Sequence, residues 1–176
     1  MADYTEIEVI DDFCSKEVFS GLEEMIMNPV SKFPWHYNKS INGKDYDNKK
    51  DVFQFVHTLY PSFNHMVEDK YMSNIWPVIS ELKSGNVLRV KANCIPRTEK
   101  IVKHGLHNDF IEKDKNITTA ILYMNTNNGY TRFKDKTRVN SKANRIVKFP
   151  YTYLHGGTTC TDEHTRVVVN FNFLKQ

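Results

Sequence analysis

The sequence is poor in cysteine and contains no long apolar run. Its three cysteines, Cys14, Cys94 and Cys160, lie far apart and form no C-x-x-C pair, so they indicate neither a disulfide framework nor a zinc knuckle. We therefore expect a reducing compartment and interpret Cys160 as a packing residue. The first residues, MADYTEIEV, lack the apolar stretch of a signal peptide, and no run of about 18 apolar residues follows. These absences predict a cytoplasmic protein without membrane contact.

A strong charge bias is absent as well. The formal net charge is +3 at pH 7 and the lysines are scattered, so no specific nucleic-acid partner is indicated. Hydrophobic residues make up 40% and charged residues 26%, which is typical of a globular protein and excludes a disordered or fibrous one. A chain of 176 residues is long enough for one compact domain and short for two. We expect a single domain over residues 1–176, of unpredicted oligomeric state.

Two helices and two strands are predicted in the first half of the chain. Ser15 is a suitable helix N-cap, and the apolar residues after it recur at helical spacing, which predicts a helix with one buried face. The residues on this face are Val18, Phe19, Leu22, Met25 and Ile26. Pro77 is expected near the start of a second helix that Gly85 ends at its C′ position. Strands are expected over residues 6–10 and 51–59, and the helices would support a sheet.

From residue 87 onward the pattern changes to short alternating segments separated by turn residues. This pattern is typical of an antiparallel sandwich or barrel. Strands are expected over residues 87–94, 106–110, 118–124, 130–133, 144–149 and 166–173. We expect residues 1–86 to supply helical support and the first strands, and residues 87–176 to form the main β core.

Within this second half, the H-x-D sequence at His107 and Asp109 is a candidate metal site. If residues 106–110 form a strand, the two side chains project from the same face, two residues apart. Together with His155 from a distant strand they would form the facial triad that holds Fe(II) and leaves coordination positions open. The spacing by itself does not distinguish iron from zinc or manganese. An isolated H-x-D pair is also more often a surface contact than a metal site.

Two other histidines are close enough in sequence to compete for this assignment. His104 precedes the H-x-D pair, and His164 lies in the polar turn TDEHT. We interpret both as solvated residues or as neighbours of the ligands. His57 and the cluster of Trp35, His36 and Tyr37 are interpreted as packing residues rather than as parts of a cleft.

The last predicted strand places a cation in the hollow of the sandwich. Its apolar face is expected to pack on the helices, and Arg166 belongs to the opposite face. An unpaired guanidinium in that position would cost several kcal/mol or more. Either Asp162 or Glu163 in the preceding turn forms a salt bridge with it, or Arg166 binds a ligand carboxylate through two hydrogen bonds.

Several motifs follow H-x-D in a fixed order. They are Tyr123 in ILYMN, Gly129-Tyr130-Thr131, Asn144-Arg145, His155-Gly156-Gly157 and Arg166 at the start of RVVVNFNF. The order resembles the Fe(II)/2-oxoglutarate-dependent dioxygenases, and in particular the small prolyl-4-hydroxylase-like branch that also occurs in phage genomes. The resemblance covers residues 87–173, about half of the chain.

The resemblance implies an α+β, mainly β fold: a double-stranded β-helix, or jelly roll, with N-terminal supporting helices. It implies that His107, Asp109 and His155 bind Fe(II), and that 2-oxoglutarate chelates the metal while its far carboxylate binds Arg166 and Tyr123. Dioxygen would be the second co-substrate, and ascorbate an accessory reductant. The reaction of the family converts 2-oxoglutarate to succinate and carbon dioxide and hydroxylates a substrate C–H bond.

The sequence departs from the family pattern at two positions. Some relatives have a tyrosine before the proline that precedes H-x-D, where this sequence has Ile95-Pro96. We expect Asn93 to supply the missing polar contact with the co-substrate, together with Asn170 on the last strand. Many relatives also have lysine in place of Arg166, which keeps the charge and changes the hydrogen-bonding geometry.

The resemblance favours a protein or peptide side chain as substrate, with proline first, and a free amino acid or another small metabolite as the alternative. The mouth of the site is expected to be built by residues 35–47, 96–103 and 134–142. Two other functions stay open from the residues alone. One is a non-catalytic jelly-roll binding module, and the other is a zinc- or manganese-dependent cupin-like isomerase, which would have no use for Arg166.

Overall fold

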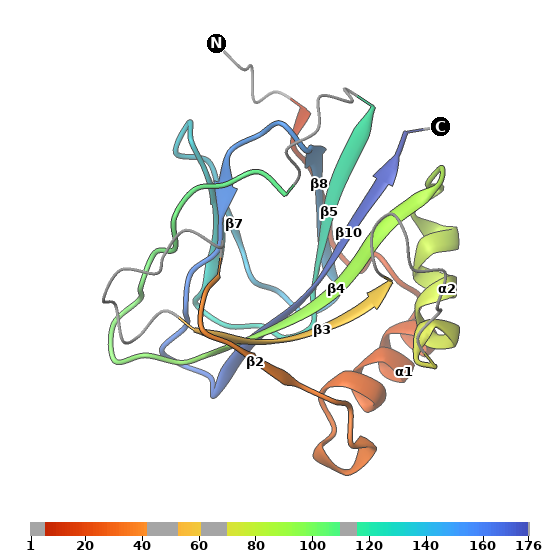
Figure 1. Ribbon diagram of the computed structural model, residues 1–176, viewed down its shortest axis with the longest axis horizontal. Helices are drawn as coiled ribbons and strands as arrows, with labels where there is room; N and C mark the ends of the chain where they lie inside the picture. Colours follow the sequence, from red (N-terminus) through yellow and green to blue (C-terminus); the bar gives the residue numbers. More distant parts are fainter. Residues whose placement is uncertain (1–5, 42–52, 61–69, 110–115, 176) are drawn as a thin grey trace.

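The computed structural model describes residues 6–41, 53–60, 70–109 and 116–175 (Figure 1). In these ranges it contains a seven-stranded sheet in the order β1-β8-β5-β10-β4-β3-β2 and a three-stranded sheet in the order β7-β6-β9. The strands are β1 (Glu8–Ile10), β2 (His36–Asn38), β3 (Gln54–Tyr60), β4 (Val87–Pro96), β5 (Ile117–Tyr123), β6 (Tyr130–Phe133), β7 (Arg138–Asn140), β8 (Arg145–Pro150), β9 (His155–Gly156) and β10 (Thr165–Leu174). The helices are α1 (Lys16–Ile26), the 3-10 turn η2 (Pro29–Ser31) and α2 (Met72–Glu81).

The predicted fold class is confirmed. The structure is mainly β, its named strand pairs are antiparallel, and the large sheet is consistent with a jelly roll. Both helices lie on one side of the large sheet, and β7 of the small sheet lies on the other side (Figure 1). The hollow between the two sheets is therefore the place where inward side chains meet.

Strand β10 occupies the middle of the large sheet, between β4 and β5. Its outward side chains are buried in the core together with residues of α1 and α2; they are Val167, Val169, Phe171 and Phe173. Its inward side chains Arg166, Val168 and Asn170 line a cavity. The period-2 alternation of a strand thus separates packing from the polar cavity, as the sequence predicted.

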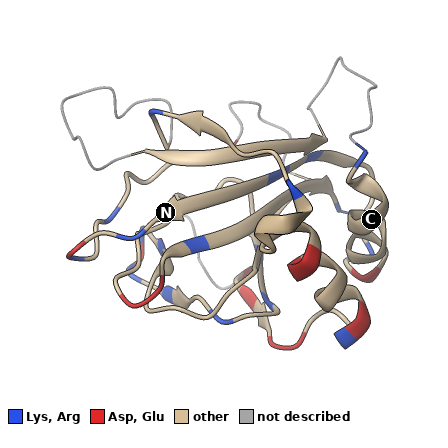
Figure 2. Ribbon diagram, turned by 90° about the horizontal axis from the view of Figure 1, so that it is seen from below, with Lys and Arg blue, Asp and Glu red and all other residues tan. Residues whose placement is uncertain are grey.

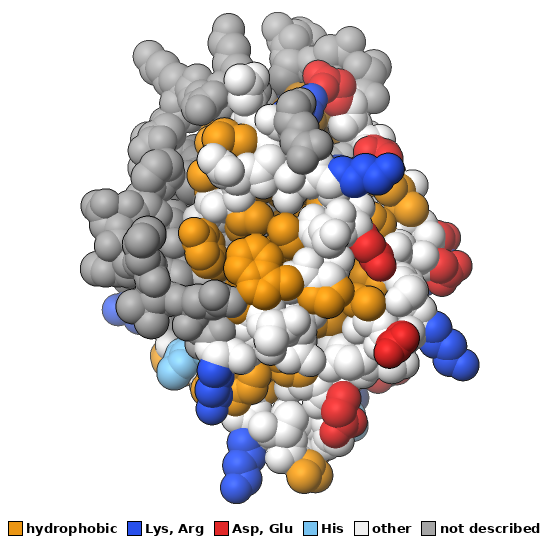
Figure 3. All heavy atoms as spheres, turned by 90° about the vertical axis from the view of Figure 1, so that its right-hand side faces the viewer, with side chains coloured by type: hydrophobic (Ala, Val, Ile, Leu, Met, Phe, Trp, Pro, Cys, Tyr) orange, Lys and Arg blue, Asp and Glu red, His pale blue; other side chains and the backbone are white. Residues whose placement is uncertain are grey.

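The first helix forms as expected. Ser15 is the N-cap of α1, and its hydroxyl accepts a hydrogen bond from the Val18 amide at 3.3 Å. The buried residues of α1 are Phe19, Leu22, Met25 and Ile26. Apolar atoms reach the surface near the centre of the side that carries the helices (Figure 3).

The second helix differs from the prediction. It begins at Met72, so Pro77 lies inside α2 and not near its start. The left-handed residue after the helix is Lys83, with φ 49°, and not Gly85. Gly85 has a different role, because a Cβ there would lie 2.7 Å from the carbonyl oxygen of Leu174. Glycine lets the chain approach the end of β10, where the Gly85 amide donates to that same oxygen at 2.9 Å.

The interpretation of the N-terminal aromatic residues as packing is confirmed for Trp35 and His57, whereas Tyr37 is 65% exposed. Phe33 lies 5.0 Å from Trp35 and 4.7 Å from His57, measured between ring centroids. His57 is buried, whereas His36 is exposed.

None of the described helices is long and apolar enough to span a bilayer.

Candidate metal and co-substrate site

The segment that carries the H-x-D pair is not a strand. Residues 106–109 contain one isolated bridge, between His107 and His155, and Phe110 lies outside the described residues. The two histidines exchange backbone N–H···O hydrogen bonds of 2.9 and 3.1 Å. A Cβ on Gly156 would lie 2.8 Å from the Gly105 carbonyl oxygen, so the glycine after His155 permits this close approach. The expected strand is wrong, but one bridge brings the two histidines together.

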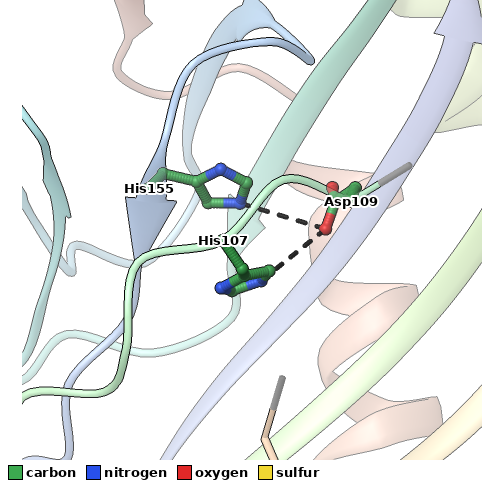
Figure 4. Close-up of side chains that lie close together, drawn as sticks. All are labelled: His107, Asp109 and His155. Carbon is green, nitrogen blue, oxygen red and sulfur yellow. Dashed lines mark ion pairs between the residues drawn. The ribbon is translucent and has the colours of Figure 1, made fainter. Parts of the chain in front are cut away.

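The three proposed ligands converge (Figure 4). Their ligand atoms all lie within 4.8 Å of one another. Asp109 Oδ1 is 3.9 Å from His107 Nε2 and 4.0 Å from His155 Nε2. These separations are too long for hydrogen bonds, so the three groups face one another without pairing, as ligands of a shared ion do. Two imidazoles and one carboxylate are the donor set of the facial triad.

The backbone orients both imidazoles toward Asp109. His155 Nδ1 lies 3.1 Å from the Tyr153 carbonyl oxygen, and His107 Nδ1 lies 3.3 Å from the Gly105 carbonyl oxygen. When each Nδ1–H donates to its carbonyl, the lone pair of each Nε2 is directed at the common point. Metal-binding histidines are usually fixed in this way.

Asp109 is held by three side chains that the sequence did not single out as functional. Its Oδ2 accepts hydrogen bonds from Asn172 at 2.9 Å and from Thr119 at 3.3 Å, and its Oδ1 lies 3.4 Å from the Arg89 guanidinium. Burial by itself would raise the pKa of Asp109. The charges of His155 and Arg89 and the Asn172 hydrogen bond outweigh that effect and hold the pKa well below its usual range. The carboxylate is therefore ionised at neutral pH.

Arg166 is buried, with 2% of its surface exposed, at the start of β10. Its Nε donates to Ser141 Oγ at 2.9 Å and its Nη2 donates to Thr131 Oγ1 at 3.1 Å. The predicted alternative of a salt bridge with the preceding turn is wrong. The Asp162 carboxylate accepts a hydrogen bond from the backbone N–H of Asn128, and Glu163 is exposed. No described carboxylate forms an ion pair with Arg166.

Two glycines of the sequence motifs make room for this guanidinium. A Cβ on Gly129 would lie 2.7 Å from Arg166 Cδ, and a Cβ on Gly157 would lie 3.1 Å from Arg166 Nη1. The glycine in GYT and the second glycine in HGG therefore belong to the environment of Arg166. Their spacing in the sequence gave no indication of this contact.

Tyr123 lies beside Arg166, and the centroid of its ring is 5.5 Å from the guanidinium carbon. Its hydroxyl donates to Thr131 Oγ1 at 2.8 Å, the same oxygen that accepts from Arg166. The side chain is fully buried and is not part of the cavity wall, whereas Thr131 is. Direct contact of Tyr123 with a co-substrate stays a prediction. In the structure the Tyr123 hydroxyl contacts Thr131, and Thr131 is the residue that lines the cavity.

These groups open on one cavity of about 390 Å³. Its wall includes His107, Asp109, His155, Arg166, Asn93 and Asn170, so all of the predicted site residues except Tyr123 reach it. Asn93 donates to the Lys91 carbonyl oxygen at 3.2 Å, and Asn170 Oδ1 is buried without a hydrogen-bond partner among the described residues. The volume lies within the usual range for small-molecule sites.

The predicted mouth is only partly correct. Asn38, Ser40 and Ile41 line the cavity, whereas none of residues 96–103 and 134–142 do. The last of these segments contains strand β7. Residues 42–47 lie outside the described residues.

Of the two alternatives given for the rival histidines, His104 follows the second, because it is buried in the cavity wall near the proposed ligands, whereas His164 is exposed. The His104 side chain is 1% exposed and lines the cavity, and neither ring nitrogen has a hydrogen-bond partner among the described residues. Burial lowers its pKa to about 3, and the charges of Arg166, His107 and Arg132 add to the effect. His104 is therefore a neutral imidazole inside the cavity.

We expect His104→Leu to stabilise the protein by about 1–3 kcal/mol at pH 7, because it removes buried nitrogens that lack partners. His104 is protonated in the unfolded chain below pH 6.5 and neutral in the folded chain down to about pH 3. Wild-type stability should therefore fall with acidity in this window, and the advantage of the variant should grow. Urea unfolding at pH 7 and pH 5 measures both effects, with His164→Leu as the exposed control. An advantage of constant size would contradict the burial of a neutral imidazole.

No protein-family model and no curated protein matches the chain. Solved structures do match. A prolyl hydroxylase from Trichoplax adhaerens, in complex with a hypoxia inducible factor oxygen degradation domain peptide, superimposes with a TM-score of 0.68 over 96% of this chain and 83% of that chain, at 10% identity. A prolyl-4-hydroxylase from Pseudomonas putida gives a TM-score of 0.60 over 97% and 92% of the two chains, at 14% identity.

HygX from Streptomyces hygroscopicus, with nickel and 2-oxoglutarate bound, gives a TM-score of 0.61 over 99% and 84% of the two chains, at 8% identity. The chain has the fold of the 2-oxoglutarate-Fe(II) oxygenases. The matching structures include a prolyl hydroxylase in complex with a peptide and HygX with hygromycin B bound. The low identities leave the chemistry of this chain to be argued from its own residues.

Proposed function

We propose that the protein is an Fe(II)- and 2-oxoglutarate-dependent dioxygenase that hydroxylates a substrate C–H bond. One observation carries this proposal: a His-Asp-His set and a buried arginine without a described carboxylate partner open on the same cavity. The first feature suits a divalent metal, and the second suits the carboxylate of a ligand. Residues 1–176 would act as one catalytic domain.

In this proposal His107, Asp109 and His155 hold the metal, which supplies the oxidising chemistry when 2-oxoglutarate and dioxygen are present. Arg166 binds the far carboxylate of 2-oxoglutarate through the N–H groups that Ser141 and Thr131 do not occupy. Thr131 and Tyr123 fix the position of the guanidinium. The buried wall around Arg166 excludes water, which strengthens these electrostatic contacts.

A zinc- or manganese-dependent isomerase would use the same three ligands. It would leave Arg166 without a role, although burying that cation costs free energy. The position of Arg166 in the metal cavity therefore favours the oxygenase. Ascorbate is proposed only as an accessory reductant.

The substrate proposal is broader. We propose a protein or peptide side chain, with proline first, because peptide-binding prolyl hydroxylases share the fold. A free amino acid or another small metabolite is the second candidate, because the described cavity wall is polar and charged. The structure of HygX with hygromycin B illustrates small-molecule binding by this fold.

Succinate formation tests the proposal. The protein loaded with Fe(II) should convert 2-oxoglutarate to succinate slowly in air, and a substrate should accelerate the conversion. The same protein loaded with Zn(II) is the control and should form none, because zinc has no redox chemistry. Binding of metal and 2-oxoglutarate without any turnover, with or without prolyl peptides and free amino acids, would instead favour a non-catalytic binding module.

A further inference from the structure

Strand β4 places two cations in the cavity. Arg89 and Lys91 alternate with buried Val90 and share the inward face with Asn93. Arg89 lies beside Asp109 and has a role in holding that ligand. Lys91 has no such role, since no described carboxylate forms an ion pair with it. Its register partner on β10 is Asn170, whose side chain is an uncharged amide.

The charges of the cavity wall do not balance. Among the described residues that line it, three cations, Arg89, Lys91 and Arg166, face a single carboxylate, that of Asp109. Apart from Glu8 on the edge strand β1, the named strands contain no acidic residue, and the described acidic residues lie on helices and loops (Figure 2). A divalent ion and a doubly charged 2-oxoglutarate would cancel each other. Among the described lining residues, the excess of cations therefore remains when both are bound.

Lys91 is half-buried, and a cation that loses part of its hydration without gaining an anion is destabilised, so the excess charge of the described wall favours a further anionic ligand. Burial lowers the pKa of Lys91, the charge of Arg89 lowers it further, and Asp109 compensates only in part. Beside Lys91, its register partner Asn170 presents an uncharged amide to the same cavity, and the N–H groups of that amide can donate to an anion. The ammonium of Lys91 and the amide of Asn170 thus form a polar part of the cavity wall, and no described carboxylate forms an ion pair with this ammonium.

We propose that Lys91 binds a carboxylate of the substrate, with Asn170 beside it, so that the substrate is a carboxylic acid. This inference rests on the proposed oxygenase function and names its substrate class. A single ammonium next to amides suits a singly charged carboxylate. A phosphate would call for several cations or a helix N-terminus. The two arginines of the wall already have proposed roles at Asp109 and at 2-oxoglutarate, and no described helix residue lines the cavity.

The place of Lys91 also limits the distance between the carboxylate and the reacting carbon. Lys91 and Arg89 are two residues apart on one strand, so their Cα atoms are about 7 Å apart. Arg89 contacts Asp109, which is a proposed metal ligand. The hydroxylated C–H bond therefore lies only a few bonds from the carboxylate, as in a free amino acid, an acidic side chain or a chain terminus.

Acid and amide pairs test the proposal on the full chain. The probes are L-proline with L-prolinamide, L-aspartate with L-asparagine, and prolyl peptides with a free or an amidated C-terminus. Each probe is titrated by calorimetry into the protein loaded with Mn(II) and 2-oxoglutarate, and succinate formation is measured with Fe(II). At least one acid should bind about tenfold or more tightly than its amide. The responding pair tells a free amino acid from a peptide.

Variants connect the effect with Lys91. Lys91→Met should reduce the preference for the acid about tenfold or more, and Lys91→Arg should restore part of it. Lys100→Met, at an exposed lysine, is the matched control and should keep the preference. Equal affinity for acids and amides, or an unchanged preference in Lys91→Met, would overturn the proposal. If wild type binds neither metal nor 2-oxoglutarate, the proposed function itself fails.

Discussion

Replacing Arg166 with leucine is expected to weaken 2-oxoglutarate binding by about 2–5 kcal/mol, which is roughly 30-fold to several thousand-fold. Arg166 is 2% exposed, the described hydrogen bonds of its guanidinium go to two hydroxyl groups, and no described carboxylate lies beside it. A ligand carboxylate would therefore be its principal charge partner. Calorimetric titration of 2-oxoglutarate into wild type and Arg166→Leu, both loaded with Mn(II), measures the loss.

Two variants separate this effect from general damage. Arg97→Leu removes an exposed arginine and should leave the affinity within twofold, or about 0.4 kcal/mol. Arg166→Lys keeps the positive charge but lacks the paired N–H donors of a guanidinium, and it should give an intermediate affinity for 2-oxoglutarate. Arg166→Leu should not lower the free energy of unfolding strongly, because it removes a buried charge without an ionic partner. Equal 2-oxoglutarate affinity in wild type and Arg166→Leu would exclude the proposed role.

Removal of a proposed metal ligand is expected to have the second large effect. His155→Ala should lower iron affinity by more than the roughly 10–100-fold that loss of an outer partner costs. Asn172→Leu removes such an outer partner, since Asn172 donates to Asp109 at 2.9 Å, and should fall within that smaller range. Metal content after dialysis against a competing chelator ranks the iron affinities of wild type, Asn172→Leu and His155→Ala.

The histidines themselves provide the control. His164→Ala changes an exposed imidazole outside the cavity and should keep full iron stoichiometry. The assignment of the triad is wrong if His155→Ala keeps iron and activity while His104→Ala loses them. Asp109→Asn supplies an independent check, because it retains the shape of the ligand and removes its charge.

The parts of the site that follow a local period could be predicted from the sequence. The alternation of β10 put Arg166 and Asn170 on one face and four apolar residues on the other, and the structure has both faces as expected. Ser15 and the stripe after it predicted α1 for the same reason. In these segments the period of the apolar residues decides which side chains face the core.

The errors and the open alternatives arose where tertiary contacts decide the local structure. The loop with His107 is held by a bridge to His155, which lies far along the chain, so no local pattern distinguished it from a strand. His104 is polar and precedes a glycine, yet the surrounding fold buries it. The hydroxyl partners of Arg166, Thr131 and Ser141, come from outside its own sheet, and no spacing in the sequence connects them with it.

Strand β10 has the same alternation along its whole length, and this has a consequence for folding errors. If β10 paired with β4 and β5 one residue out of register, each of its side chains would exchange faces. Arg166 would enter the apolar layer beneath α1 and α2, and Val167 would take its place in the cavity. Such a misfolded molecule would bury a charge among apolar groups and would also be unable to recognise a carboxylate. The residues to which we assign the chemistry of this strand therefore also disfavour the incorrect register, and a molecule able to bind the proposed co-substrate would be one whose central sheet is correctly assembled.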